Sequence, residues 1–269
     1  MPKSSPSAAQ QDYLLRLASH RKRIRLARIL ILVVFLLCWE LSSQLGWIDS
    51  FIFSSPSSLI RTGIDMLFHQ QLLRHIGITL GETLISFIIS TLLGIFLSVV
   101  LWWCPSLYEA TEPYLVALNS LPKSALAPIL IVWFGNTVRT TVITSILLTI
   151  IVTVLTVLSG FQETEDEKAR LIYSLGGKKR QVLTMILLPS NIPVIMNVLR
   201  VNIGLSLIGV IIGEFLSAKA GLGYLIIYGS QIFKMDWVLL SIVLLCLMAV
   251  LLYQGLGLLG SRLSRRFSS

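Results

Sequence analysis

Charged side chains are scarce in this chain of 269 residues. Asp, Glu, Lys and Arg together make up 13% of it, whereas hydrophobic residues make up 55%, and the mean hydropathy is +0.82. Soluble domains carry about 25% charged residues. The shortage of charge therefore excludes a soluble globular fold of this size and indicates an integral membrane protein.

The residue types that build catalytic and metal sites are also few. The three histidines, His20, His69 and His75, lie outside the middle of the long apolar runs, so a histidine base or a metal cluster inside the membrane is not expected. The chain has no Gly-x4-Gly-Lys-Ser/Thr loop to hold the phosphates of a nucleotide. We therefore expect no catalytic residue, metal or cofactor in this chain, and no ATP hydrolysis by it.

Cysteine is rare as well. Cys38, Cys104 and Cys246 stand singly in apolar surroundings, a pattern that fits neither a disulfide nor a metal site. We expect these cysteines to be buried apolar fillers.

Long apolar segments, in contrast, are abundant. A helix needs about 20 apolar residues to cross about 30 Å of hydrocarbon, whereas the strands of a barrel alternate polar and apolar residues over about ten positions. Six continuous apolar runs meet the requirement for a helix: 29–46, 76–101, 115–134, 138–159, 191–213 and 238–260. The sequence predicts an all-α fold, a polytopic bundle of six transmembrane helices.

Basic residues are distributed unevenly between the ends of these runs. If the six helices alternate in direction, sixteen Lys and Arg residues fall on one side, and Arg200 lies within a helix, from which it can snorkel to the surface. The opposite side has five: Arg61, Arg74, Arg139, Lys219 and Lys234. The positive-inside rule then places both termini in the cytoplasm. This topology explains the net charge of +9 without nucleic-acid binding.

The segment 162–189 is strongly polar although it lies between two apolar runs. Its acidic stretch, 164–167, suits the first turn of a helix, and Gly176 with Gly177 suits the end of that helix. Three apolar residues fall on one face between them: Leu171, Ile172 and Leu175. Such a face suits a groove on another protein. The alternatives are a helix on the lipid surface and a helix packed against its own bundle.

Two prolines interrupt the third apolar run. Pro122 and Pro128 remove backbone hydrogen bonds where hydrocarbon cannot replace them, and Asn119, Ser120 and Ser124 lie near enough in sequence to bond the freed carbonyls. Broken helices are tolerated where they line a cavity. The run is therefore a candidate for the wall of a polar path through the membrane, with a simple kink as the alternative.

Two carboxylates fall within the predicted spans, where a charge costs about 2.5–3.5 kcal/mol at the helix centre, and a third directly follows the fifth span. Glu40 suits an interfacial or interhelical hydrogen bond. Glu82 lies one turn from Thr79, so both can face the interior of the bundle. Glu214 falls at the outer end of the fifth helix, where it can contact a partner, stabilise a gate or be solvated.

Several motifs, in order along the chain, resemble those of one family. The motifs are His75-x3-Thr79-Leu80, Leu121–Pro128, Val132–Gly135, Gly213-Glu214 and Gly221–Tyr224. From about His75 to Leu256 the chain is similar to the permease subunits of binding-protein-dependent ABC importers with the type I fold, in the aliphatic sulfonate, taurine and nitrate branch.

The polar segment is similar to the cytoplasmic motif of this family, in which Glu-Ala-Ala is followed at fixed spacing by Gly, Ile and Leu-Pro. The later positions are in register, whereas Arg170 stands where the family has its glutamate and reverses its charge. Glu163, Glu165 and Glu167 lie upstream, where they can compensate. The resemblance implies an ATPase-coupling segment that includes Arg170, Leu171, Ile172, Leu175, Gly176, Gly177, Ile186, Leu188 and Pro189.

The resemblance also implies partners and a location. Two cytoplasmic ATPase subunits would bind ATP and Mg, an external solute-binding protein would deliver the solute, and a second permease copy would complete a homodimer in the lipid of a bacterial plasma or inner membrane. The outer gate or the contact with the binding protein would include Glu214, Gly221, Gly223 and Tyr224. The translocation pathway, for a sulfonate, taurine, nitrate or a related small molecule, would include Thr79, Glu82, Ser120, Pro122, Ser124 and Pro128.

These expectations divide the chain into four parts. They are a cytoplasmic basic segment, 1–28, the first transmembrane helix with an outer loop, 29–74, the permease core, 75–260, which contains the coupling segment 162–189, and a cytoplasmic basic tail, 261–269. No cleavage site follows the first apolar run, so we expect no cleaved signal. Two other functions stay open: a secondary transporter driven by an ion gradient, and a membrane scaffold that recruits a soluble partner.

Overall fold

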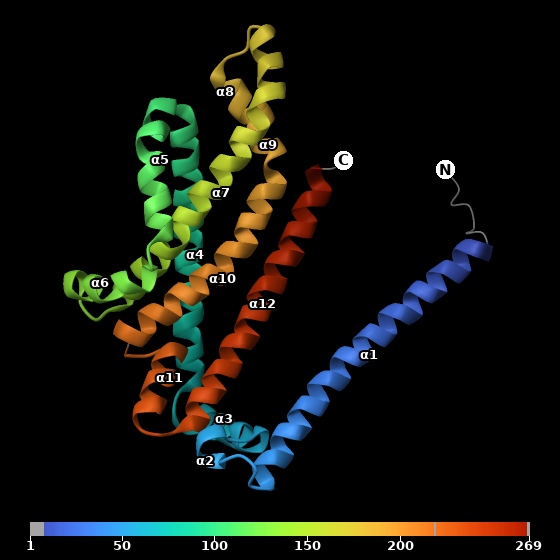
Figure 1. Cartoon of the computed structure of the whole chain (residues 1–269), viewed down its shortest axis with the longest axis vertical. Coiled ribbons are helices and arrows are strands. Elements are labelled where there is room, and N and C mark those ends of the chain that lie inside the picture. Colours follow the sequence, from blue (N-terminus) through green and yellow to red (C-terminus); the bar gives the residue numbers. More distant parts are fainter. Residues whose placement is uncertain (1–7, 218, 268–269) are drawn as a thin grey trace. The chain divides into compact units, whose positions relative to one another are not determined.

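The computed structural model describes the backbone of residues 8–217 and 219–267, and all of their side chains except those of 8–18, 21, 25, 123–124, 165–169 and 259–267. Every regular element of the described backbone is helical (Figure 1). Contacts divide the chain into two compact units, Met1–Ile64 and Asp65–Ser269.

The first unit contains one long helix. α1 (Ala8–Gln44) is followed by the short α2 (Ser50–Phe53) and by the first residues of α3 (Pro56–His69). Near the end of α1, Glu40 accepts hydrogen bonds from the backbone N–H of Ser57 at 3.0 Å and from its hydroxyl at 2.8 Å. The interhelical hydrogen bond expected for Glu40 is therefore confirmed.

Among its described residues, the second unit has four helices that are long and apolar enough to cross a membrane. These are α4 (Leu72–Trp103), α7 (Val138–Ser174), α10 (Ile192–Ser217) and α12 (Met235–Phe267). The connecting elements are α5 (Pro105–Ser120), the 3-10 helix η1 (Lys123–Leu126), α6 (Ala127–Phe134), α8 (Lys179–Gln181), the π-helix η2 (Val182–Leu187), α9 (Leu188–Ser190) and α11 (Leu222–Gln231). The turn between α7 and α8 lies at one end of this unit, and α11 lies toward the other (Figure 1).

Three of the long helices, α4, α7 and α12, contain the runs predicted at 76–101, 138–159 and 238–260, and α10 nearly coincides with the run at 191–213. The third run is different. It is shared between α5, η1 and α6, and Pro122 lies in the break, as its missing N–H predicts. Pro128 lies in the first turn of α6, where no N–H is needed. The described residues thus support four of the six predicted spans, and the predicted interruption of the third run is found at Pro122 but not at Pro128.

The helices α4, α7 and α10 pack through small and polar residues. A Cβ added to Gly209 on α10 would lie 2.5 Å from the Cα of Ser145 on α7, so the glycine allows the two backbones to approach closely. Asn202 on α10 donates to the hydroxyl oxygens of Thr91 on α4 and Thr153 on α7, both at 2.9 Å. All three side chains are buried, and their hydrogen bonds join the three helices.

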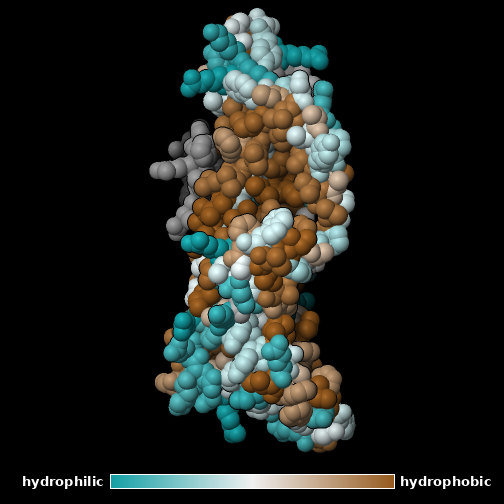
Figure 2. Space-filling view, turned by 90° about the vertical axis from the view of Figure 1, so that its left-hand side faces the viewer, coloured by the Kyte–Doolittle hydropathy of each residue, from teal (hydrophilic) through white to brown (hydrophobic). Residues whose placement is uncertain are grey.

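An apolar core lies toward the end of the second unit that holds the turn between α7 and α8. It consists of Leu101, Trp102, Val154, Val157, Leu158, Phe161, Val182, Leu187 and Val198. Many other large apolar side chains are exposed. Figure 2 shows a broad hydrophobic surface directly below the hydrophilic residues at the top of the view. Because lipid solvates apolar groups, such residues need not be inside the fold. Cys38, Cys104 and Cys246 are all exposed, so the prediction that they are buried is wrong.

Candidate functional site

The polar segment 162–189 forms a helical hairpin at one end of the second unit. α7 continues from its apolar part to Ser174 without a break, so the separate short helix predicted to begin near Thr164 is wrong. The reason is local, because no glycine or proline interrupts residues 161–175 and helical hydrogen bonding propagates once begun. The side chains of Glu165 and Glu167 lie outside the described ones.

The hairpin turns at the two glycines predicted to end the helix. Gly176 has a φ of +79°, the left-handed conformation that glycine adopts without a Cβ penalty. The N–H of Gly177 donates to the carbonyl of Ile172 at 2.8 Å, and the N–H of Gly176 donates to the carbonyl of Tyr173 at 3.0 Å. This pair of bonds is a Schellman motif, which ends α7 and fixes the direction of the turn.

The end of α7 presents two large apolar side chains to the outside. Leu171 is 62% exposed and Leu175 is 78% exposed. Ile172, predicted on the same face, instead packs against the apolar core together with Leu188. The other residues predicted for coupling are exposed or half-buried: Arg170, Gly176, Gly177, Ile186 and Pro189. The hairpin therefore has one apolar contact inward and a second, uncovered apolar surface at its tip.

Polar contacts hold both arms of the hairpin. Lys179 donates to the carbonyl of Trp103 at the end of α4 at 2.8 Å, and its ammonium lies 4.9 Å from the ring centre of Trp102. Asn191 donates to the hydroxyl of Thr164 across the hairpin at 3.1 Å. These contacts fasten the hairpin to the end of α4 and join its two arms.

Toward the other end of this unit, Glu214 lies at the centre of a buried network. The residue is 1% exposed near the end of α10. Its Oε1 accepts a hydrogen bond from the hydroxyl of Thr79 on α4 at 2.6 Å, and its Oε2 accepts one from the N–H of Gly223 at 2.5 Å. The Thr79 oxygen in turn accepts from the N–H of Leu222 at 2.8 Å. The loop between α10 and α11 is thereby fastened to α4.

Gly221 and Gly223 leave room for this carboxylate. A Cβ on Gly223 would lie 2.8 Å from Oε2 of Glu214, and a Cβ on Gly221 would overlap the carboxylate itself. Gly221 also has a φ of +121°, which other residues rarely adopt. Its N–H donates to Nδ1 of His75 at 3.0 Å. Both glycines of the Gly-Leu-Gly sequence are therefore needed, because the Glu214 side chain lies too close to leave room for a Cβ.

Glu82 lies on α4 beside the Glu214 side chain and is 4% exposed. Its Oε2, and the hydroxyl oxygen of Ser86 one turn away, have no hydrogen-bond partner among the described residues. The structure thus places Thr79 and Glu82, predicted for the pathway, next to the residues predicted for the outer gate.

Burial changes the interpretation of Glu214. A solvated side chain or a direct partner contact would need exposure, so the structure favours the stabilising role, in which Glu214 holds the loop.

Tyr224 is half-buried and stacks between His75 and Tyr228, with ring centres 6.1 and 5.6 Å apart. Sequence reasoning did not select His75 as a site residue. Its spacing of four residues from Thr79, which puts both on one face of α4, is the signal that could have found it.

The other residues predicted for the pathway take no part in this network. Ser120, Pro122 and Pro128 are exposed along α5, the break and α6. Ser120 donates to the carbonyl of Val116 at 3.0 Å, within its own helix. The side chain of Ser124 lies outside the described ones.

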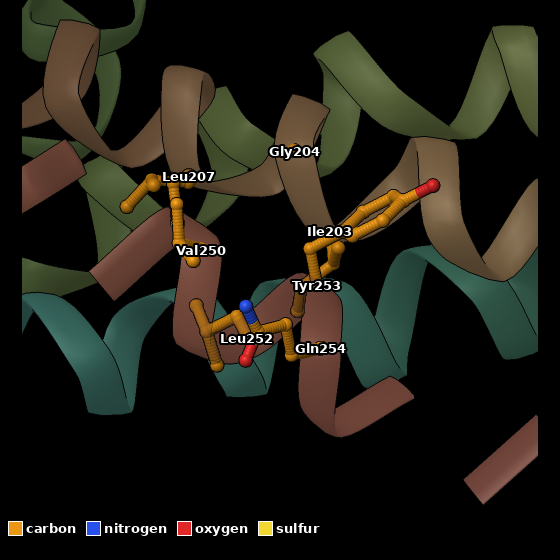
Figure 3. Close-up of a pocket in the computed structure, with 8 residues that line it drawn as sticks. Ile203, Gly204, Leu207, Val250, Leu252, Tyr253 and Gln254 are labelled. Carbon is orange, nitrogen blue, oxygen red and sulfur yellow. The ribbon is translucent and has the colours of Figure 1, made fainter. Parts of the chain in front are cut away.

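A hollow of about 460 Å³ opens between α10 and α12 (Figure 3). Its lining includes Ile203, Leu207 and Val250, and its polar side chains are Tyr253 and Gln254. Burying a charged group against so apolar a surface is costly. This hollow therefore suits an apolar chain rather than a charged solute.

The sequence of this chain is similar to those of known proteins over most of its length. Residues 90–269 match the family described as "Binding-protein-dependent transport system inner membrane component". The formylaminopyrimidine transport permease protein ThiX of Halalkalibacterium halodurans is 31% identical over 195 residues, which cover 72% of this chain and 77% of ThiX. The taurine transport system permease protein TauC of Escherichia coli is 24% identical over 238 residues, covering 87% and 86%. The putative aliphatic sulfonates transport permease protein SsuC of Escherichia coli is 26% identical over 216 residues, covering 79% and 81%.

Proposed function

The chain belongs to the binding-protein-dependent transport system inner membrane components, as a transmembrane permease subunit of an ABC importer, and we propose that its α7–α8 hairpin is the docking point for the ATPase. One observation carries this proposal. The hairpin tip exposes Leu171 and Leu175, although both arms are held by Lys179 and Asn191. An uncovered apolar surface on a rigid support suits a groove on a partner protein.

The proposed assembly is a homodimer with two cytoplasmic ATPase subunits and one external binding protein. Each chain crosses the membrane six times, with both termini and the hairpin in the cytoplasm. The ATPases bind ATP and Mg, and their closure pulls the two hairpins together. Because each hairpin is braced to α4 through Lys179 and continues into α10, this movement turns the helices and exposes the pathway alternately to the two sides.

The solute is proposed to be small and polar. The relatives' names mention formylaminopyrimidine, taurine and aliphatic sulfonates, so these compounds, and nitrate as a further small anion, are the ones to try first. Of the predicted pathway residues, Ser120 and Pro122 are exposed in the broken run and are available to line a path shared by two copies.

Replacing Leu171 and Leu175 by Glu tests the docking surface. We expect the double variant to insert and fold normally, because both side chains are exposed, and to lose at least 90% of the co-purifying ATPase and of ATP-dependent uptake. Leu107→Glu is the matched control, since Leu107 is an exposed leucine in the first turn of α5.

Unchanged ATPase recovery in the double variant would show that the hairpin is not the docking point. Uptake by the wild-type chain that persists without any ATPase would instead favour an ion-driven transporter.

A further inference from the structure

A second hollow, of about 280 Å³, lies beside the Glu214 network. It is formed where the start of α4, the loop between α10 and α11, and the starts of α11 and α12 meet. Six of its lining residues are Arg74, His75, Lys219, Tyr224, Tyr228 and Trp237. Arg74 and Lys219 are among the five basic residues predicted on the outer side. This hollow would therefore open toward the external binding protein.

The charges of the hollow are of one sign. The exposed side chains of Arg74 and Lys219 come from segments about 145 residues apart, and the lining contains neither Asp nor Glu. His75 accepts the N–H of Gly221 at Nδ1, so the neutral ring carries its proton on Nε2 as a further donor. Two cations and a ring donor around an open hollow favour an anionic group.

The wall of the hollow is aromatic and fixed. The rings of His75, Tyr224, Tyr228 and Trp237 follow one another with centres 6.1, 5.6 and 6.1 Å apart. Lys234 lies 4.7 Å from the ring centre of Trp237 at the far end of this series. At the near end, hydrogen bonds to His75 and Thr79 fasten the loop and the start of α11 to α4, and one to Glu214 fastens them to α10. The hollow is therefore preformed and does not need ordering when it is filled.

We propose that this hollow is the receptor for a carboxylate-bearing side chain, Asp or Glu, on the external binding protein. The proposal rests on the proposed function and names the contact through which the binding protein is recognised. Glu214, Gly221 and Gly223 are buried and so do not contact the binding protein directly. The exposed side chains beside them, Arg74, Lys219 and Tyr228, make this contact instead.

The composition of the lining favours a protein partner over a free anion. Tyr, Trp and Arg are the residues that dominate the energy of protein interfaces, and the hollow has all three. Its volume holds one side chain with its carboxylate against the cations while the stem lies along the aromatic rings. Charged groups at the rim of such a contact act mainly on the rate of association and make it dependent on salt.

The test uses the complete importer in nanodiscs, with the binding protein that supports uptake by the wild-type complex. We expect Arg74→Glu with Lys219→Glu to raise the binding-protein concentration for half-maximal ATPase stimulation at least 10-fold. The maximal rate at saturation and the ATPase rate without binding protein should stay within 2-fold of wild type. The matched control is Arg139→Glu, because Arg139 is exposed and predicted on the same side but lies outside the hollow. This control should shift the half-maximal binding-protein concentration less than 2-fold.

A compensating change makes the test specific. One Asp→Arg or Glu→Arg substitution on the binding protein should restore half-saturation with the Arg74→Glu complex. A shift below 2-fold in the double variant would overturn the proposal, as would a lower maximal rate with unchanged half-saturation, which would assign the hollow to the solute. A shift seen only in anionic lipid, and absent in phosphatidylcholine nanodiscs, would assign it to a headgroup. If the proposed function itself fails, the wild-type complex shows no stimulation by any binding protein.

Discussion

At the scale of single residues, Thr79 is the position on which the Glu214 network depends most. Its hydroxyl donates to Glu214 at 2.6 Å and accepts from the N–H of Leu222 at 2.8 Å. Thr79→Val keeps the shape of the side chain but leaves both groups without that partner in a buried site. Each loss costs about 1–3 kcal/mol, so we expect the variant to unfold about 5–10 °C below wild type in detergent.

Thr83 provides the control for this prediction. It is also fully buried on α4, but its hydroxyl donates only to the carbonyl of Thr79 in its own helix. Thr83→Val should therefore lower the unfolding temperature by about 2 °C or less, and Thr79→Ser, which keeps the hydroxyl, should behave similarly. Equal effects of the two valine variants would show that Thr79 does not hold the loop.

The sequence indicated which polar residues matter here but not how they meet. Glu82, Thr79 and Glu214 stand out because polar groups are costly within apolar runs. Their common location depends on α4 meeting the loop before α11, a contact between residues about 140 positions apart that no local pattern contains. The sequence therefore leaves three roles open for Glu214, a partner contact, a gate and a solvated side chain, whereas the fold buries it against two glycines.

At the scale of helices, prediction succeeded where a continuous apolar run decides the element. α4, α7, α10 and α12 follow from such runs, because a chain in hydrocarbon must satisfy its backbone hydrogen bonds locally. The length of α7 did not follow, since the helix continues past its apolar part until Gly176 ends it. The π-helix η2 in the returning arm also has no signal in the apolar pattern.

The broken run between α5 and α6 makes a prediction of its own. If it lines the pathway, a cysteine at the exposed Ser120 should react with small polar thiol reagents, and the rate should differ at least 5-fold between ATP-bound and nucleotide-free complexes. The background must lack Cys38, Cys104 and Cys246, because all three are exposed. Ser98→Cys is the control, since Ser98 is fully buried and should stay unreactive. A rate at Ser120 that does not change with nucleotide would indicate a simple kink.

At the scale of the whole molecule, the broken run decides the topology. α4 and α7 are each long and apolar enough to cross the membrane in one helix, and the segment from α5 to α6 lies between them. If this segment crosses, α7 begins outside and the α7–α8 hairpin is cytoplasmic. If it does not cross, the hairpin and its basic residues are outside, on the side opposite the end of α4, which contradicts both the positive-inside rule and the hydrogen bond from Lys179 to the carbonyl of Trp103. The ATPase can dock only in the first case.

Labelling of intact cells with a membrane-impermeant maleimide distinguishes the two topologies. The natural Cys104 lies between α4 and α5, and a cysteine replacing Asn136 would lie between α6 and α7. We expect Cys104 to remain unlabelled until the cells are opened, and Asn136→Cys, in a chain without other cysteines, to be labelled at once. A cysteine replacing Lys178 in the hairpin should behave like Cys104, and one replacing Lys219 should behave like Asn136→Cys. Labelling of Cys104 and of the Asn136 position from the same side would mean that α5 and α6 do not cross, and the six-span arrangement with its cytoplasmic hairpin would have to be abandoned.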